Sequence, residues 1–151
     1  MTAELNAQRQ SLYETDYVQW IETTVQQLKQ HNYGAIDWEN LIDEIESMAR
    51  SDRRSLKSNL VVILTHLLKW QFQSERRSNS WKASIAEHRR RVRDLLKDSP
   101  SLKPYFEEVF AECYEDAIDQ ASIETELPKS TFPRSCPYTI AQVLEAGFLP
   151  E

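Results

Sequence analysis

Glycine and cysteine are scarce in this chain of 151 residues, and each shortage excludes a class of protein. Only Gly34 and Gly147 are present, whereas a β-rich domain needs many turn glycines and a phosphate-binding loop or dinucleotide fingerprint needs several. The two cysteines, Cys113 and Cys136, are too few for a disulfide framework and form no CxxC pair. We therefore expect a helical protein with reduced thiols and no nucleotide-binding loop.

Long apolar runs are also missing. The longest run, Leu60 to Leu64, is far shorter than the ~20 residues that cross a bilayer. Residues 1–10 contain no apolar stretch of the kind found in signal peptides. The sequence therefore predicts a cytoplasmic protein without a membrane partner.

The net charge of -6 conceals three blocks of alternating sign. Residues 1–48 carry nine acidic and two basic side chains, residues 49–97 carry four acidic and thirteen basic, and residues 98–151 carry eleven acidic and three basic. A basic centre between acidic flanks has two interpretations. It is either an exposed cationic surface for a polyanion or a set of helices joined by opposite charges.

Apolar residues recur at the three- and four-residue steps of helices through most of the chain. We predict a flexible N-terminal tail at residues 1–11 and a single helical domain over residues 12–151. The expected fold is an all-α, up-and-down bundle of four main helices with a Pro-rich C-terminal strap and a short terminal helix. Gly34 is expected to end the first helix, and the second is expected to run for ~35 residues to Phe72, with Ser51 and Asp52 as the place where a bend could occur. The helix caps expected from the sequence are Thr15, Asp37, Ser80, Ser101 and Thr139.

The run HLLKWQFQSERRSNSWKASI, from His66 to Ile85, resembles the signature of a bacterial family known as domain of unknown function 29. Four more segments follow the same family pattern: LYETDYVQW, DWENLIDEIES, SPSLKPY and FPRSCPYTIAQVL. The likeness covers roughly residues 12–150, although Ser74 stands where proline is usual and Glu126 where glycine is usual after the fourth helix. The resemblance implies a small all-helical protein without an assigned activity.

Basic and aromatic side chains are interleaved in the 69–97 hairpin. Guanidinium groups contact phosphates and indoles stack on bases, so this hairpin is a candidate for nucleic-acid binding. The candidate binding residues are Lys69, Arg76, Arg77, Trp81, Lys82, Arg89 and Arg93.

A second interpretation makes the same charges structural. Lys82, Arg89, Arg93 and Lys97 form a basic stripe on the third helix, and Glu108, Glu112, Glu115 and Asp119 form an acidic stripe on the fourth. If the two helices are antiparallel, the stripes meet, and we expect internal ion pairs. Arg76 and Arg77 are expected to bond the last free carbonyls of the second helix.

Metal binding has one candidate set. Folding the hairpin about its turn brings His66 level with His88, and the next turn of the chain brings Cys113 near them, which is a sensible donor set for zinc. His88 and Cys113 lie on apolar stripes, however, where a buried histidine with a backbone partner is the commoner case. We expect no bound metal and no cofactor.

The sequence favours a non-catalytic cytoplasmic module that binds a protein partner or itself. Nucleic-acid binding and a metal-dependent enzyme with the His, His, Cys site are the alternatives. Residues 38–49 face the first helix alone, and two helices cannot bury Trp20 and Trp38 together. A bend near Ser51, a cover from the strap or a symmetric dimer would supply the missing contact.

Overall fold

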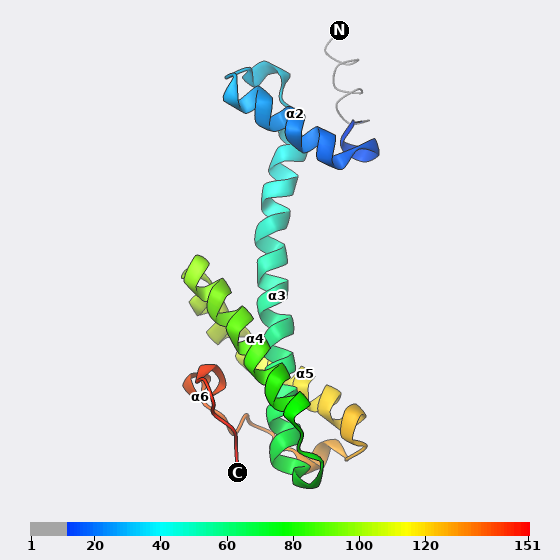
Figure 1. Cartoon of the computed structure of the whole chain (residues 1–151), viewed down its shortest axis with the longest axis vertical. Helices are drawn as coiled ribbons and strands as arrows, with labels where there is room; N and C mark the ends of the chain where they lie inside the picture. The colour runs from blue at the N-terminus through cyan, green and yellow to red at the C-terminus, as the bar shows by residue number, and fades with distance from the viewer. Residues whose placement is uncertain (1–11) are drawn as a thin grey trace. The chain divides into compact units, whose positions relative to one another are not determined.

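A computed structural model describes residues 12–151, and the tail predicted at residues 1–11 lies outside the described residues. The main helices are α2 (Tyr17–Lys29), α3 (Trp38–Phe72), α4 (Asn79–Asp98) and α5 (Leu102–Thr125), followed by the short α6 (Ile140–Leu144) (Figure 1). Three 3-10 turns, Tyr33–Ala35, Ser74–Arg76 and Lys129–Thr131, lie between them. No strand occurs between residues 12 and 151, so the predicted all-α class is confirmed.

The chain divides into two compact units. The first ends at Arg50 and the second runs from Ser51 to Glu151. Helix α3 contributes to both, because it is helical without interruption for 35 residues, as the sequence predicts. The first unit contains α2 and the start of α3, and the second contains the rest of α3 with α4, α5 and α6.

Three helix ends differ from the sequence prediction. Asp16, not Thr15, caps α2, because its carboxylate accepts a hydrogen bond from the Gln19 backbone at 3.0 Å. Ser78, not Ser80, caps α4 by accepting from the backbone of Trp81 at 3.3 Å. Helix α2 ends at Lys29, five residues before Gly34, and His31 takes the left-handed backbone conformation with φ of 57°.

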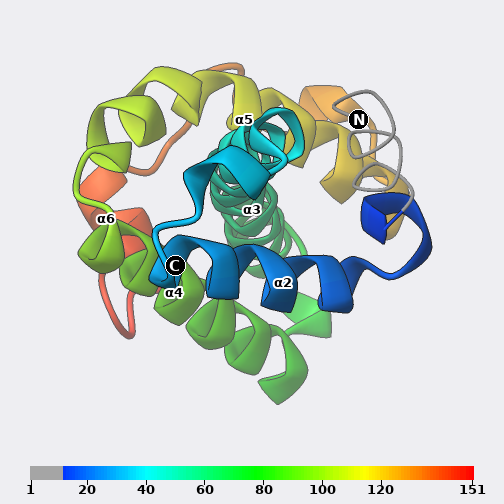
Figure 2. The ribbon, with the colours of Figure 1, turned by 90° about the horizontal axis from the view of Figure 1, so that it is seen from above.

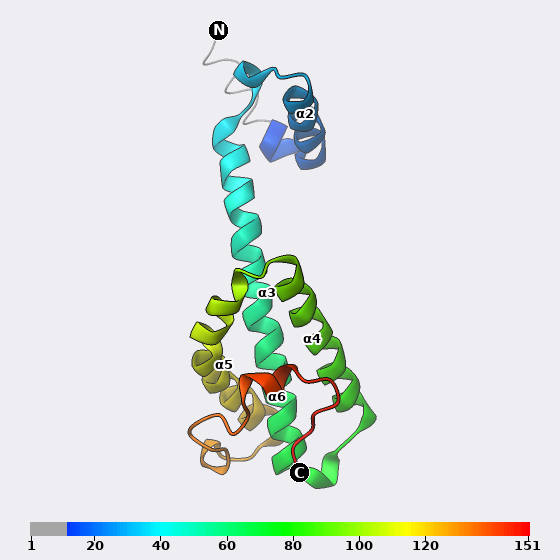
Figure 3. The same cartoon turned by 90° about the vertical axis from the view of Figure 1, so that its left-hand side faces the viewer.

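Helix α3 is the centre of the second unit. Helices α4 and α5 flank it and α6 crosses nearby, as Figures 2 and 3 show. Leu56, Leu60 and Leu64 of α3 are fully buried, because neighbours cover this part of α3 on several sides. Each such side chain contributes ~1.5–3 kcal/mol when it leaves water. The other helices add Ile85, Val92, Phe106, Val109, Cys113, Ala117, Ala121 and Val143 to the same core.

The strap after α5 is part of this core. Phe132 and Tyr138 are buried, and the Tyr138 hydroxyl donates to Gln71 Oε1 at 2.7 Å. The Tyr114 hydroxyl donates to the carbonyl of Pro133 at 2.5 Å. Thr139 caps α6 as predicted, in a reciprocal pair of hydrogen bonds with Gln142. The strap therefore belongs to the second unit.

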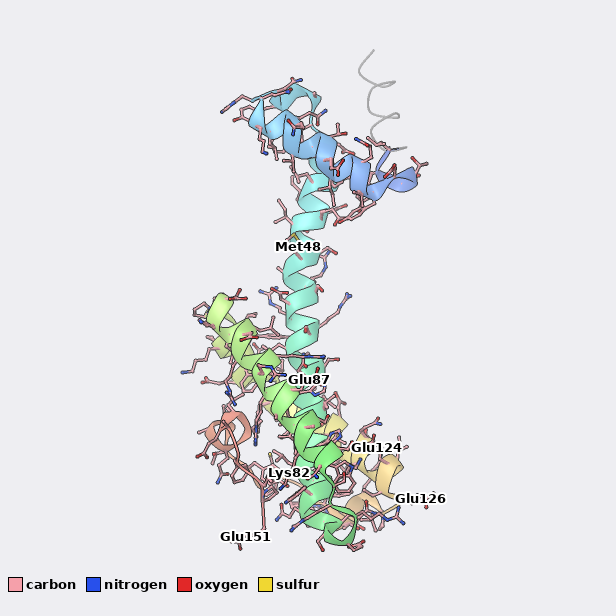
Figure 4. The ribbon with its side chains drawn as sticks, viewed as in Figure 1. Met48, Lys82, Glu87, Glu124, Glu126 and Glu151 are labelled. Carbon is pink, nitrogen blue, oxygen red and sulfur yellow. The ribbon has the colours of Figure 1, made fainter. Side chains whose placement is uncertain are left out.

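Helix α5 ends at a strained residue. Glu126 lies in the left-handed region, with φ of 60° and ψ of 16°. This conformation costs a non-glycine residue roughly 1–2 kcal/mol, which is why glycine is common at helix C-termini. Two hydrogen bonds hold the turn: Ser122 Oγ donates to the Leu127 carbonyl at 2.6 Å, and the Leu127 backbone donates to Thr125 Oγ1 at 3.2 Å. Figure 4 shows Glu126 beyond the end of α5.

We expect Glu126→Gly to raise the free energy of unfolding by about 0.5–1 kcal/mol, because glycine adopts this backbone conformation without strain. Glu115→Gly is the matched control, since Glu115 is exposed in the interior of α5. That substitution should lower stability by about 1 kcal/mol. Urea unfolding measures both changes, and equal losses in the two variants would contradict the strain at Glu126.

Candidate functional site

The large apolar side chains that stay exposed are concentrated in the first unit. Nine of the ten exposed residues of this kind in the described range lie between Tyr17 and Met48, and the tenth is Ile123. We call the nine the apolar face: Tyr17, Val18, Ile21, Val25, Tyr33, Trp38, Ile42, Ile45 and Met48. Trp38 is 46% exposed, Ile42 52% and Ile45 58%. Five of the nine line one groove: Tyr17, Ile21, Val25, Ile45 and Met48. Exposed apolar residues gathered in this way are typical of interaction sites.

The apolar face exists because the apolar stripes of α2 and α3 are wider than their mutual contact. Ile21 and Val25 are one helical turn apart on α2, as are Trp38 and Ile42 on α3. Each helix covers one side of the other, which buries Trp20 and leaves these four exposed. The sequence predicts the shortage of cover around Trp38, but it does not predict which residues of the apolar stripe on α2 stay exposed. The signal in the sequence is the width of that apolar stripe, because one neighbouring helix cannot cover all of it.

A groove lies between α2 and the first turns of α3, within the first unit. It has a volume of about 400 Å³ and ten lining residues, of which Glu44 alone is charged. Trp20 lines it and is 4% exposed, and its indole Nε1 donates to no acceptor in the described part of the chain. Thr24 satisfies its own hydroxyl by donating to the Trp20 carbonyl at 2.7 Å. The groove is therefore apolar apart from one carboxylate.

That carboxylate is held by two tyrosines. Glu44 accepts hydrogen bonds from the hydroxyls of Tyr13 and Tyr17, the latter at 2.6 Å. These bonds lower the pKa of Glu44 and raise the pKa of Tyr13 to about 12, because they stabilise the ionised carboxylate and the protonated phenol. The Tyr13 ring also meets Trp20 edge to face, with centroids 4.8 Å apart. Glu44 therefore places a fixed negative charge beside the apolar groove at neutral pH.

The predicted basic residues at the end of α3 surround Trp70. Arg77 Nε donates to the Trp70 carbonyl at 2.8 Å, and its guanidinium lies 4.9 Å from the centre of the Trp70 ring. Lys82 Nζ lies 5.4 Å from the same ring. The expected bond from Arg77 to a terminal carbonyl of the second helix is confirmed. The same expectation is wrong for Arg76, which is exposed and makes no such bond within residues 12–151.

Lys69 and Trp81 form a second cation–π pair. Lys69 Nζ lies 4.5 Å from the Trp81 ring and 3.7 Å from Glu124 Oε2, and Lys69 is 9% exposed. A buried ammonium needs such partners, because desolvation without them is costly. The packing of α3 against α4 and α5 therefore accounts for Lys69 and Trp81.

Arg89 is buried rather than available for binding. It is 2% exposed, and its guanidinium donates to the Val143 carbonyl at 2.7 Å and to the Gln142 carbonyl at 3.3 Å. The Phe148 ring lies 6.0 Å away. Burial lowers the pKa of Arg89, and the two carbonyls compensate for the lost water. Arg89 therefore attaches α6 to α4.

The expected ion pairs between α4 and α5 are not formed. Glu112 pairs with Lys57 of α3 at 2.8 Å, and Asp119 pairs with Lys129 of the strap at 2.8 Å. No ion pair joins α4 to α5 in residues 12–151, which corrects the prediction of an internal basic stripe. The acidic side chains of α5 find partners on α3 and the strap instead. The stripe of α4 is exposed except for Arg89, at Lys82, Arg90, Arg93 and Lys97.

The three candidate metal ligands are His66, His88 and Cys113, and both histidines bond to backbone carbonyls. His66 Nδ1 bonds the Val62 carbonyl at 2.9 Å, and His88 Nδ1 bonds the Ser84 carbonyl at 2.7 Å. Burial lowers the pKa of His66 and raises the pKa of Cys113 to about 11, so the thiol stays protonated at neutral pH. No group of three metal-ligating side chains occurs among the described residues. The described structure does not bring the candidate residues His66, His88 and Cys113 together as a metal-binding group.

Two shallow cavities flank α3 in the second unit. One, of about 380 Å³, contains Asp116 and Glu124, and the other, of about 440 Å³, contains Arg54 and Arg91. Arg91 is already paired with Glu87 at 2.6 Å, and Figure 4 shows Glu87 on α4. Both cavities are lined mostly by polar side chains. Ser58 lines both cavities, with His66 in the first and His88 in the second, but no hydrogen bond joins Ser58 to either histidine within residues 12–151.

The model of the family described as "Domain of unknown function DUF29" matches residues 12–149. The chain belongs to the DUF29 family. No curated protein and no solved structure gives a significant match to this DUF29 protein. None of the helices in the described range is long and apolar enough to cross a membrane.

We expect Arg89→Met to destabilise this DUF29 protein by about 1–3 kcal/mol, because it leaves buried carbonyls of α6 without a donor. Arg89→Lys should recover less than half of the loss, since an ammonium lacks the planar fork that reaches two carbonyls. Arg93→Met is the control and should change stability by less than about 0.5 kcal/mol, because Arg93 is exposed. Thermal and urea unfolding measure all three, and an unchanged Arg89→Met variant would contradict the role assigned to Arg89.

Proposed function

We propose that this DUF29 protein is a non-catalytic, cytoplasmic interaction module whose apolar face binds another polypeptide. The observation that carries the proposal is the concentration of exposed apolar side chains on the first unit, nine of the ten in the described range. Covering them removes apolar area from water, which is the main favourable term in protein association. The second unit needs no such cover, because its apolar residues are packed in one core.

The chemistry of the polar groups supports a binding role over a catalytic one. Burial raises the pKa of both Cys113 and Cys136, which disfavours the thiolate that a cysteine nucleophile requires. His66 and His88 use one ring nitrogen each on their own helix backbone. The apolar groove offers a single carboxylate, Glu44, already bonded by two tyrosines.

Site-specific photo-crosslinking tests the proposal. A photoreactive residue in place of Ile45 should yield a covalent adduct of defined mass in the native cells. The same residue in place of Ile123 is the matched control, because Ile123 is 73% exposed but lies outside the apolar face. Adding Ile42→Asn should remove the Ile45 adduct without lowering the melting temperature, because Ile42 is itself exposed.

The adduct mass separates the possible occupants, since a second copy adds 17.7 kDa. Light scattering of the purified protein checks the same point. The proposal fails if Ile45 and Ile123 give the same products, or if Ile45 gives none and the purified protein is a monomer.

The exposed stripe on α4 supports a second candidate function, nucleic-acid binding. Lys82, Arg90, Arg93 and Lys97 are exposed and make no ion pair with α5. Lys82 lies eight residues before Arg90, and Arg93 and Lys97 follow at steps of three and four, so all four lie on one side of the helix. A row of cations with this spacing can track a phosphate backbone. The net charge of -6 opposes nonspecific binding, so the stripe would have to act locally.

Heparin chromatography tests this candidate. A functional stripe predicts retention through physiological salt and loss of retention in a Lys82→Gln, Arg93→Gln, Lys97→Gln variant, because fewer cations release fewer counterions. Lys29→Gln, Lys103→Gln, Lys129→Gln is the control with the same change in net charge. Elution of the wild-type protein below physiological salt would exclude this function.

A further inference from the structure

We infer that the occupant of the apolar face is a basic amphipathic helix from another protein. This inference rests on the proposed function and names the partner of the same surface. Three observations carry it: the form of the groove, the charges that border it and the lack of a matching surface on a second copy.

The groove has the form that a helix fills. It runs between two helices, α2 and the start of α3, with Ile21 and Val25 on one side and Ile45 and Met48 on the other. Helix α2 has 13 residues, or about 20 Å at a rise of ~1.5 Å per residue. Helix α2 crosses the start of α3 rather than running alongside it (Figures 1 and 2), so a helix in this groove would follow one of the two and meet the other where they cross. Apolar residues at three- and four-residue steps on that helix would contact the lining residues of both. The exposed apolar residues that line the groove would then be buried against the third helix.

The charges around the groove are acidic. Residues 12–50 carry eight acidic and two basic side chains, a net charge of -6. Glu22 lies within one turn of Val18 and Val25, and Glu39 lies within one turn of Ile42, so both carboxylates border the apolar face. Glu44 adds the fixed charge inside the groove. A helix with an apolar stripe flanked by Lys and Arg matches this surface in both respects.

A second copy of the chain offers no such surface. In residues 12–151 its large exposed apolar side chains are, apart from Ile123, those of its own first unit, which is equally acidic, so two of these faces would repel each other. Its basic helix α4 presents Lys82, Arg90 and Arg93 to solvent but buries Ile85 and Val92 in the core. Neither surface combines exposed apolar residues with basic ones. A heterologous partner is the occupant that satisfies both.

Two synthetic peptides test the inference on the full chain. Both are amphipathic helices of about 18 residues, long enough to be helical in isolation, and they share one Leu face. One carries Lys on its polar face and the other carries Glu. We expect the Lys peptide to bind at least about ten-fold more tightly by fluorescence anisotropy, and the difference to shrink at high salt as exposed charges are screened.

Paired substitutions locate the binding. Ile21→Ser with Ile45→Ser should weaken the Lys peptide at least about ten-fold, because these residues line the groove. Glu22→Gln with Glu39→Gln should bring the two peptides closer in affinity. Ile123→Ser with Glu107→Gln changes an exposed apolar and an acidic residue outside the first unit and should leave both affinities unchanged.

Each remaining outcome overturns the inference in a distinct way. Equal binding of both peptides would mean an apolar occupant without a charge requirement. Lys-peptide binding that survives Ile21→Ser with Ile45→Ser would place that peptide elsewhere on the acidic surface. No binding of either peptide, together with a specific adduct from the photoreactive residue at position 45, would reject the basic helix and keep the proposed function. A stable dimer by light scattering would assign the face to a second copy.

Discussion

Helix α3 carries an apolar stripe along its whole length, and burying that stripe is the constraint on which the rest of the structure depends. The stripe is buried in one part of the helix and largely exposed in another. Between Leu56 and Trp70 the stripe is covered by α4, α5 and the strap, and the side chains are buried. Between Trp38 and Met48 the available neighbour is α2, and a single helix covers one side of another. The same regular element therefore produces a closed core in the second unit and an incomplete one in the first.

The fold was predictable because its signals are local. Apolar periodicity, the scarcity of glycine and the prolines after Leu127 are enough to predict four main helices, a strap and a terminal helix. The helix caps were less predictable, since Thr15 and Asp16, or Ser78 and Ser80, have similar capping chemistry and lie one or two residues apart.

The roles of the charged residues depend on contacts that sequence spacing does not reveal. Arg89 has the same spacing as the exposed Arg93, yet it is buried because the carbonyls of α6, more than fifty residues away in the chain, come to lie beside it. The acidic stripe of α5 was predicted to pair with basic residues of α4. Its members Glu112 and Asp119 pair instead with Lys57 and Lys129. The shortage of cover around Trp38 was predictable, because it follows from counting neighbours rather than from geometry.

The two acidic blocks of the chain differ in how far ion pairs compensate their charge. The acidic C-terminal block pairs with basic residues within the second unit, as Lys69 with Glu124 and Lys57 with Glu112 illustrate. The acidic N-terminal block forms fewer such pairs: in the described part of the first unit, Glu46 with Arg50 is the one ion pair, at 3.7 Å between exposed groups. Exposed pairs of this kind contribute little. The first unit therefore has both the uncompensated negative charge and most of the exposed apolar side chains. A single basic, amphipathic partner would neutralise the charge and cover the apolar residues together.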